Sequence, residues 1–131
     1  MIHGWIMPFM LAVQMPAAVD LRPLFEAIRQ VETGAEAHPA NAVGDHGASL
    51  GPYQIKKEYW RDSGVPGSYG QVREKNYAER VMIAYWQRFC PQALAQGDWR
   101  TLARVHNGGP NGPVEPRTIA YWQRVRRLLR G

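Results

Sequence analysis

Cys90 is the only cysteine in this chain of 131 residues, so no intrachain disulfide can form. A chain of this length can bury a hydrophobic core large enough for one domain without crosslinks or metal. Hydrophobic residues make up 45% of the sequence and charged residues 21%, which is typical of a globular protein rather than a disordered one. We therefore expect a single domain held together by its core.

The N-terminus carries a short apolar run over residues 5–13, followed by small residues that end at Ala18. This pattern resembles a secretory signal, although no Lys or Arg precedes the run and Pro8 interrupts it. The run is too short to cross a bilayer, so no stable membrane insertion is expected. Two interpretations stay open for residues 1–18, a signal peptide or an apolar arm lying on the domain over 19–131.

Helical periodicity dominates the chain after the N-terminal run. Asp20 is placed to cap a first helix and Gly34 to end it, with Leu24, Ile28 and Val31 at helical spacing between them. The sequence predicts further helical segments over 56–60, 72–89, 98–105 and 117–129. Residues 39–54 are rich in Gly, Ala and Asn and are interpreted as loop and a small β-hairpin. The fold class expected is α+β, mostly α-helical.

The apolar positions of the two longest predicted helices indicate which faces are buried. For the helix over 72–89, which is expected to end at Pro91, the inward residues are Tyr77, Val81, Ala84 and Tyr85. For the last helix they are Ile119, Trp122, Val125 and Leu129.

The formal net charge of +5 favours polyanionic partners, among them a bacterial wall. The last helix carries much of this charge, on Arg117, Arg124, Arg126, Arg127 and Arg130. These arginines form either a solvated surface or a face that attracts anionic wall polymer. Charge alone supports nucleic-acid binding, which we do not expect. The histidines have no metal-ligand spacing and no phosphate-binding loop is present, so no metal or cofactor is expected.

Glu32 lies at the end of the first predicted helix, directly after Val31 and one turn after Ile28. Apolar surroundings disfavour a charged carboxylate, and so does the negative end of the helix dipole. Both effects raise the pKa of a carboxyl, and a carboxyl that is protonated near neutral pH can act as a general acid. The alternative interpretation is an exposed glutamate at a helix end.

Asp45 follows thirteen positions later in a glycine-rich turn, between Gly44 and Gly47. Turn aspartates commonly accept hydrogen bonds from nearby backbone amides, which stabilise the charged form. A protonated and a charged carboxyl facing one another are what glycoside hydrolysis requires. The sequence therefore predicts a catalytic pair, Glu32 and Asp45, provided that the hairpin folds toward the end of the first helix.

Five runs of this chain carry a family resemblance. They are VETG at 31–34, GDHGASLGPYQIKKEYW at 44–60, RDSG at 61–64, ARVHNGGPNG at 103–112 and YWQRV at 121–125. In this order they resemble the invertebrate-type (destabilase) lysozymes, over about residues 24–125. The resemblance implies a lysozyme-like fold, with the family's general acid at Glu32 and its second carboxylate at Asp45.

The chain departs from that family in one systematic way. The family is rich in disulfides, whereas this chain has Ala35, Leu50, Ser63 and Pro113 where its usual cysteines would stand. This difference suggests a cysteine-poor bacterial or phage-like relative. It also leaves the path of the loop between Gly34 and Gly44 uncertain.

Several further residues are candidates for binding sugar. Aromatic faces stack on pyranose rings, so Tyr53 and Trp60 are expected to line subsites, against the alternative that both belong to the core. The resemblance implies that Gln54 and Asn107 bind N-acetyl groups and that His106 and Gly108 lie near the cleft. For His106, a structural hydrogen bond is the favoured interpretation.

A second activity comes from the resemblance alone. Some members of the family are credited with isopeptidase activity, and the matching positions here are Ser49, Lys56 and His106. Ser49 also lies in a G-x-S-x-G match, but this short chain lacks the strand and helix alternation that a serine-hydrolase elbow requires. We treat the isopeptidase as a minor activity.

The function expected is a muramidase that cleaves β-1,4 bonds between N-acetylmuramic acid and N-acetylglucosamine, in peptidoglycan or related chito-oligosaccharides. The alternatives are a lytic transglycosylase that uses Glu32 alone, and a non-catalytic basic module that binds the cell wall. We expect a monomer that is secreted or periplasmic, with a cytoplasmic protein released in the manner of a phage enzyme as the other localisation.

Overall fold

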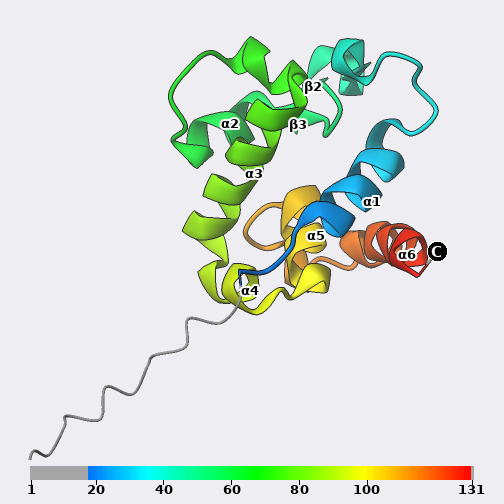
Figure 1. Ribbon diagram of the computed structural model, residues 1–131, viewed down its shortest axis with the longest axis vertical. Helices are drawn as coiled ribbons and strands as arrows, with labels where there is room; N and C mark the ends of the chain where they lie inside the picture. The colour runs from blue at the N-terminus through cyan, green and yellow to red at the C-terminus, as the bar shows by residue number, and fades with distance from the viewer. Residues whose placement is uncertain (1–17, 131) are drawn as a thin grey trace, which may run out of the picture.

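The computed structural model describes residues 18–130, so the predicted signal or arm lies almost entirely outside the described residues. Figure 1 shows the arrangement of helices and short strands. The α-helices are α1 (Arg22–Thr33), α2 (Lys57–Ser63), α3 (Lys75–Phe89), α4 (Pro91–Gln96), α5 (Trp99–Gly108) and α6 (Arg117–Leu129). The strands are β1 (Val43–Gly44), β2 (Ser49–Leu50) and β3 (Ile55–Lys56). Four 3-10 turns complete the chain, η1 (Pro39–Asn41), η2 (Asp45–Gly47), η3 (Tyr69–Arg73) and η4 (Gly112–Val114).

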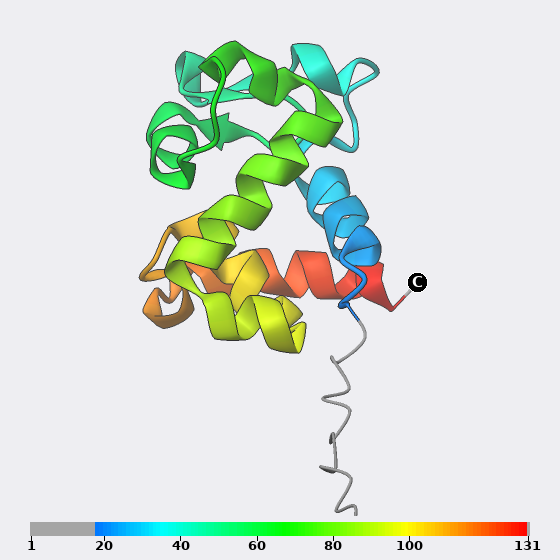
Figure 2. The same cartoon turned by 60° about the vertical axis from the view of Figure 1, so that its left-hand side comes forward.

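The elements form two lobes joined by long helices. The strands and α2 make up one lobe, while α4, α5 and α6 make up the other (Figures 1 and 2). Helix α3 runs from the first lobe to the second, and α1 lies beside α6 with its C-terminal end toward the strands. Within residues 18–130, no helix is both long and apolar enough to cross a membrane.

The core forms where α1, α3 and α5 meet at Trp86. This side chain is fully buried, stacks on Phe25 of α1 at 5.8 Å between ring centroids, and donates its indole N–H to the carbonyl of Leu102 in α5 at 3.0 Å. Leu24 and Ile28 of α1 are also fully buried, as their helical spacing predicts. The mostly helical single domain expected from the sequence is therefore confirmed, and it is held by a continuous core.

Hydrogen bonds at both ends of α1 hold the helix in place and position its last turn. The N-cap residue is Leu21 rather than the predicted Asp20, although the Asp20 carboxylate still accepts the backbone N–H of Arg22 in the first turn at 3.0 Å. At the other end, the buried Thr33 hydroxyl donates to the carbonyl of Pro52 at 2.9 Å. This bond ties the last turn of α1, which carries Glu32, to the loop between β2 and β3.

The predicted hairpin is confirmed and gains a third strand. The sheet is antiparallel with the order β1-β2-β3, and its register pairs Gly44 with Ser49 and Ser49 with Lys56. Residues paired across neighbouring antiparallel strands lie close together. The register therefore brings Ser49 and Lys56 beside the turn that begins at Asp45.

Two helical predictions need correction. Helix α3 starts at Lys75 rather than Val72, because the separate 3-10 turn η3 precedes it. A helix that the sequence analysis missed, α4, begins at Pro91, since proline is tolerated in the first turn of a helix. Pro91 therefore starts a new helix directly after the end of α3.

The buried face of α6 includes the predicted Val125, with Trp122 and Leu129 packed partly buried against the core, but it differs from the prediction at Ile119. Ile119 is 43% exposed, whereas Thr118, Tyr121 and Val125 are buried. Thr118 points inward because its hydroxyl is the hydrogen-bond partner of the buried Arg104 guanidinium. Its hydroxyl accepts a hydrogen bond from Nε of Arg104 in α5 at 2.8 Å and donates to the carbonyl of Gly112 at 2.6 Å.

This Arg104–Thr118 bond is expected to fix α6 against α5. Thr118→Val keeps the shape but leaves Nε of the buried guanidinium without a partner, so we expect the free energy of unfolding to fall by about 2 kcal/mol. Thr118→Ser keeps the hydroxyl and loses one methyl group, which should cost about 1 kcal/mol. Urea unfolding of both variants measures the difference. Equal losses would show that the methyl contact, and not the hydrogen bond, is what matters.

Candidate active site

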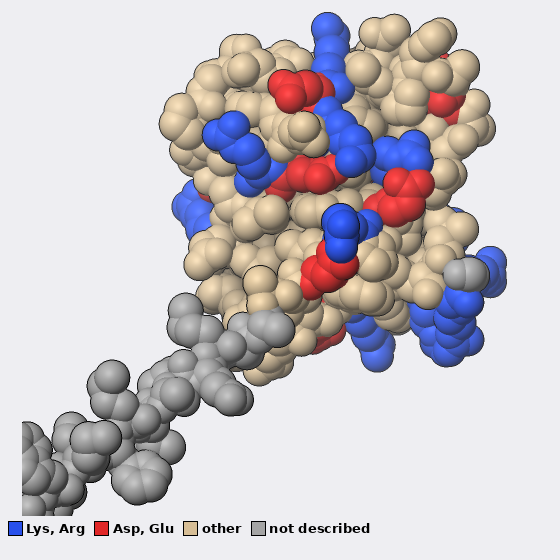
Figure 3. All heavy atoms as spheres, viewed as in Figure 1, with Lys and Arg blue, Asp and Glu red and all other residues tan. Residues whose placement is uncertain are grey.

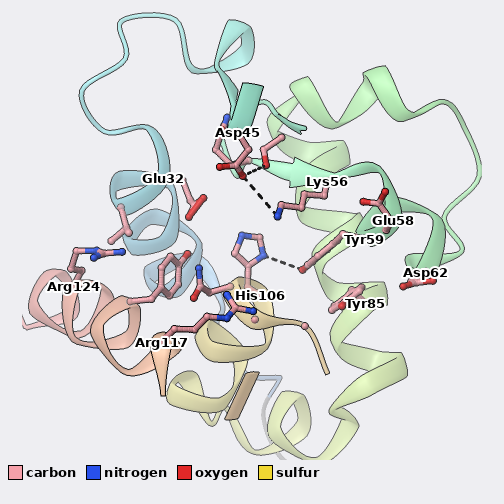
Figure 4. A pocket seen from close by; sticks show the side chains of 17 residues that line it. Glu32, Asp45, Lys56, Glu58, Tyr59, Asp62, Tyr85, His106, Arg117 and Arg124 are labelled. Carbon is pink, nitrogen blue, oxygen red and sulfur yellow. Dashed lines mark hydrogen bonds and ion pairs between the residues drawn. The ribbon is translucent and has the colours of Figure 1, made fainter. Parts of the chain in front are cut away.

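A cleft of about 630 Å³ runs between the two lobes. It is lined by residues of α1, the sheet, α2, α3, α5 and α6, and Figure 4 shows the charged and aromatic side chains that enter it. Of the residues proposed from the sequence, the ones that line it are Glu32, Asp45, Ser49, Gln54, Lys56, His106, Asn107 and Gly108. Positions up to 76 residues apart in the chain are thus brought to one surface.

Glu32 enters the cleft from the last turn of α1. Burial raises the pKa of its carboxyl from 4.5 to about 7, and the nearby charge of Asp45 adds to the increase. The Tyr121 hydroxyl and the Arg124 guanidinium, both on α6, act in the opposite direction and lower this pKa. The raised pKa agrees with the expectation from sequence, and burial of the carboxyl in the cleft is its main cause.

Asp45, the second predicted carboxylate, enters the cleft from η2, the turn after β1. Its backbone is left-handed, with φ of 51°, and His46 follows with φ of 56°, a conformation that aspartate tolerates better than most residues. The carboxylate accepts a hydrogen bond from the Ser49 hydroxyl at 3.0 Å, and Nζ of Lys56 lies 3.9 Å away. Asp45 is 65% exposed, so its charged form is solvated as well as paired.

The two carboxyl groups therefore lie in contrasting environments. Both side chains line the cleft and point into the same part of it (Figure 4). The Glu32 carboxyl is partly buried and favours its neutral form, while the Asp45 carboxyl faces water and two polar partners. This division suits one proton donor and one anion.

His106 lies beneath the pair and is held by both ring nitrogens. Because a carbonyl can only accept, Nε2 carries the hydrogen and donates to the carbonyl of Tyr53 at 3.1 Å. Nδ1 then accepts the hydroxyl of Tyr59 at 3.0 Å. Burial lowers the pKa of the imidazole to about 4, so it is neutral near pH 7. Both ring nitrogens therefore make structural hydrogen bonds, and neither is left to act as a base for Ser49.

Two aromatic residues predicted to bind sugar do not line the cleft. Tyr53 is fully buried, and its hydroxyl donates to the carboxylate of Glu79 on α3. The indole N–H of Trp60 donates to the hydroxyl of Tyr77 at 2.9 Å, on the side of α2 that faces α3. The Tyr53 ring belongs to the core and the partly buried Trp60 packs against it where α2 meets α3, so neither ring lines the cleft as expected.

The sequence analysis missed the contribution of α6 to the cleft. Arg117, Tyr121 and Arg124 all line it. Their spacing of four and three residues places them on one helical face, which is a signal that the sequence contains. It was overlooked because Ile119 and Trp122 suggested a different inward face.

Comparisons with known proteins agree with the geometry. The Destabilase family model matches residues 24–128. A lysozyme of Magallana gigas is 37% identical over 79 residues, which cover 59% of this chain and 58% of the relative. Invertebrate-type lysozyme 6 of Caenorhabditis elegans is 32% identical over 107 residues, covering 72% of this chain and 78% of the relative. The match thus spans less than two thirds of the oyster protein's length.

The fold comparison points the same way. The crystal structure of Tapes japonica lysozyme superimposes with a TM-score of 0.69 at 30% sequence identity, covering 80% of this chain and 87% of that one. The chain belongs to the destabilase, or invertebrate-type lysozyme, family. The bacterial or phage-like origin suggested by the missing cysteines stays a prediction.

The raised pKa of Glu32 makes a prediction for stability. A carboxyl whose pKa is higher in the folded state contributes stability that is complete below the unfolded value of 4.5 and is lost as the pH rises through about 7. Glu32→Gln removes this dependence. We therefore expect the variant to gain about 2 kcal/mol relative to wild type between pH 5 and pH 8, measured by urea unfolding.

Because wild type and Glu32→Gln share every other titratable group, the difference between their free energies of unfolding isolates the contribution of Glu32. His106 changes stability over a similar pH range but is present in both, so its contribution cancels in the difference. Glu74→Gln, at an exposed position away from the cleft, controls for the loss of one carboxylate. A difference between wild type and Glu32→Gln that stays constant with pH would contradict the raised pKa.

Proposed function

We propose that this protein is a muramidase that hydrolyses the β-1,4 bond between N-acetylmuramic acid and N-acetylglucosamine in peptidoglycan. The observation that carries the proposal is the pair of carboxyls in one cleft, with Glu32 partly buried and its pKa raised to about 7 by that burial. The lysozyme names of its relatives supply the substrate class.

The residues suggest a sequence of steps. Glu32 donates its proton to the leaving glycosidic oxygen as the bond from that oxygen to the anomeric carbon breaks. The Asp45 carboxylate, held by Ser49 and Lys56, bonds to the anomeric carbon or stabilises its positive charge. Glu32 then takes a proton from water, and the resulting hydroxide replaces Asp45 at that carbon.

The alternative chemistry at the same site is lytic transglycosylation. That reaction needs one acid and no second carboxylate, and it produces anhydromuramic ends. Asp45 and Glu32 line the same cleft, which favours hydrolysis. Glycoside hydrolysis by two carboxyl groups requires both of them to reach the scissile bond. A silent wall-binding module would have no use for a buried carboxyl with a raised pKa.

The isopeptidase activity implied by the resemblance is not part of this proposal. Ser49 donates its hydroxyl hydrogen to Asp45, and His106 uses both nitrogens elsewhere. Ser49 is therefore better explained as a residue that orients the Asp45 carboxylate.

The direct test is digestion of purified peptidoglycan by wild type, Glu32→Gln and Asp45→Asn. Removing a general acid typically costs about 10² to 10⁴ in rate, so we expect Glu32→Gln to lose at least a hundredfold. Asp45→Asn should lose a comparable factor, while Glu74→Gln keeps wild-type activity. Turbidity clearing and release of reducing ends measure the rates.

Product chemistry separates the alternatives. Mass spectrometry should find hydrated reducing ends, whereas anhydromuramic ends together with an active Asp45→Asn would identify a transglycosylase. Wild-type protein that binds wall material without any turnover would identify a binding module. Retention of the anomeric configuration, observed by NMR at early times, is expected if Asp45 forms the covalent intermediate.

A further inference from the structure

Helix α6 presents two sets of arginines to two different surfaces. Arg117 and Arg124 lie on the same face as Tyr121 and line the cleft. Arg126, Arg127 and Arg130 line a separate groove with Gln123. Basic side chains gather where α6 ends in the space-filling view (Figure 3). The basic helix expected from the sequence is therefore divided, and part of its charge belongs to the active site.

The guanidinium groups of Arg117 and Arg124, which line the cleft, have few hydrogen-bond acceptors among the described residues. Arg117 has Glu115 as its partner among the described residues, at 3.7 Å, and the two side chains are 62% and 41% exposed. Such an exposed pair is weak and leaves most of the guanidinium N–H groups free. Arg124 makes no ion pair within residues 18–130, where its ring contact is Tyr121, at 5.8 Å from the guanidinium carbon to the centroid.

Tyr121 provides an independent indication that a ligand belongs here. Its side chain is 2% exposed, yet its hydroxyl has no hydrogen-bond partner of normal geometry among the described residues. Glu32 is its neighbour and a weak hydrogen-bonding contact between the two lowers the pKa of that carboxyl, but the pair does not reach the geometry of a normal hydrogen bond. Buried polar groups are normally satisfied, so an unsatisfied hydroxyl facing a cleft indicates that water or a ligand completes it.

The charge of the cleft is asymmetric. Arg117 and Arg124 lie on the side formed by α6, whereas Glu58 and Asp62 lie on the side formed by α2 (Figure 4). Asp62 is partly compensated by Arg88, 3.8 Å away. A substrate that crosses the cleft therefore meets positive charge on the α6 side and negative charge on the other.

We propose that Arg117 and Arg124, with the Tyr121 hydroxyl between them, form a subsite for a carboxylate carried by the glycan. This inference rests on the proposed function and adds to it the group that identifies the substrate. Guanidinium groups bind carboxylates through paired N–H donors, which gives direction as well as attraction. Peptidoglycan supplies such a carboxylate either on the lactyl ether of muramic acid or on its stem peptide. Chito-oligosaccharides have the same β-1,4 backbone without it.

Arg117 gives the cleaner test, because the charge of Arg124 also acts on Glu32. Dissociation constants are measured in the Glu32→Gln background, which prevents cleavage during titration. The ligands are a chito-oligosaccharide, a peptide-free peptidoglycan glycan chain, and the same chain with stem peptides. Arg126→Gln is the matched control, since it removes the same charge from the other side of the same helix.

We expect Arg117→Gln to weaken binding of the carboxylate-bearing glycans about tenfold relative to the chito-oligosaccharide. Arg117→Lys, which keeps the charge, should recover part of this loss. A loss on the peptide-free chain assigns the lactyl carboxylate, and a loss confined to the peptide-bearing chain assigns the stem peptide.

Three results would overturn the subsite. They are an equal loss for all ligands, no loss for any, and an equal loss in Arg126→Gln. Digestion of peptidoglycan by the wild-type protein tests the muramidase activity independently of the subsite. If wild type cleaves peptidoglycan but Arg117→Gln binds like its parent, the subsite is wrong and the muramidase stands.

Discussion

Partial burial of the Glu32 carboxyl, in a cleft that α6 lines with Tyr121 and Arg124, is the constraint on which the site depends. A glutamate at a helix end would ordinarily be solvated, and its carboxyl would be charged at neutral pH. Here α6 packs against α1 and brings Tyr121 and Arg124 to the cleft that Glu32 lines, and burial of the carboxyl in this cleft is the main cause of the raised pKa. The acid therefore owes its protonation to tertiary packing, and any change in the position of α6 alters it.

Two hydrogen bonds remote from the sugar fix this packing. The Arg104–Thr118 bond joins α5 to α6, and the Thr33–Pro52 bond joins the end of α1 to the strand lobe. Both are at least partly shielded from water, where an unmade bond is costly. The stacked Trp86 and Phe25 supply the remaining connection between the helices.

Local features of the site could be predicted from the sequence, and its long-range features could not. The placement of Glu32 at a helix end, the Asp98 cap, whose side chain accepts the N–H of Thr101, and the bounds of α6 all depend on neighbours within a few residues. The error over Tyr53 arose because its partner Glu79 lies 26 residues away. The inward face of α6 was misjudged because a buried Thr118 is explained only by Arg104, on another helix. Apolar periodicity carries no information about such polar partners.

The arrangement of α6 also connects substrate charge to the acid. Arg124 lowers the pKa of Glu32 in the free protein, which opposes the effect of burial. A carboxylate bound at Arg117 and Arg124 would offset that positive charge and add a negative one beside Glu32. Both changes favour the protonated carboxyl, because a nearby anion disfavours ionisation. On this argument the proposed subsite would do more than hold the glycan: a correctly charged substrate would strengthen the protonation of the group that cleaves it, and an uncharged chitin chain would not.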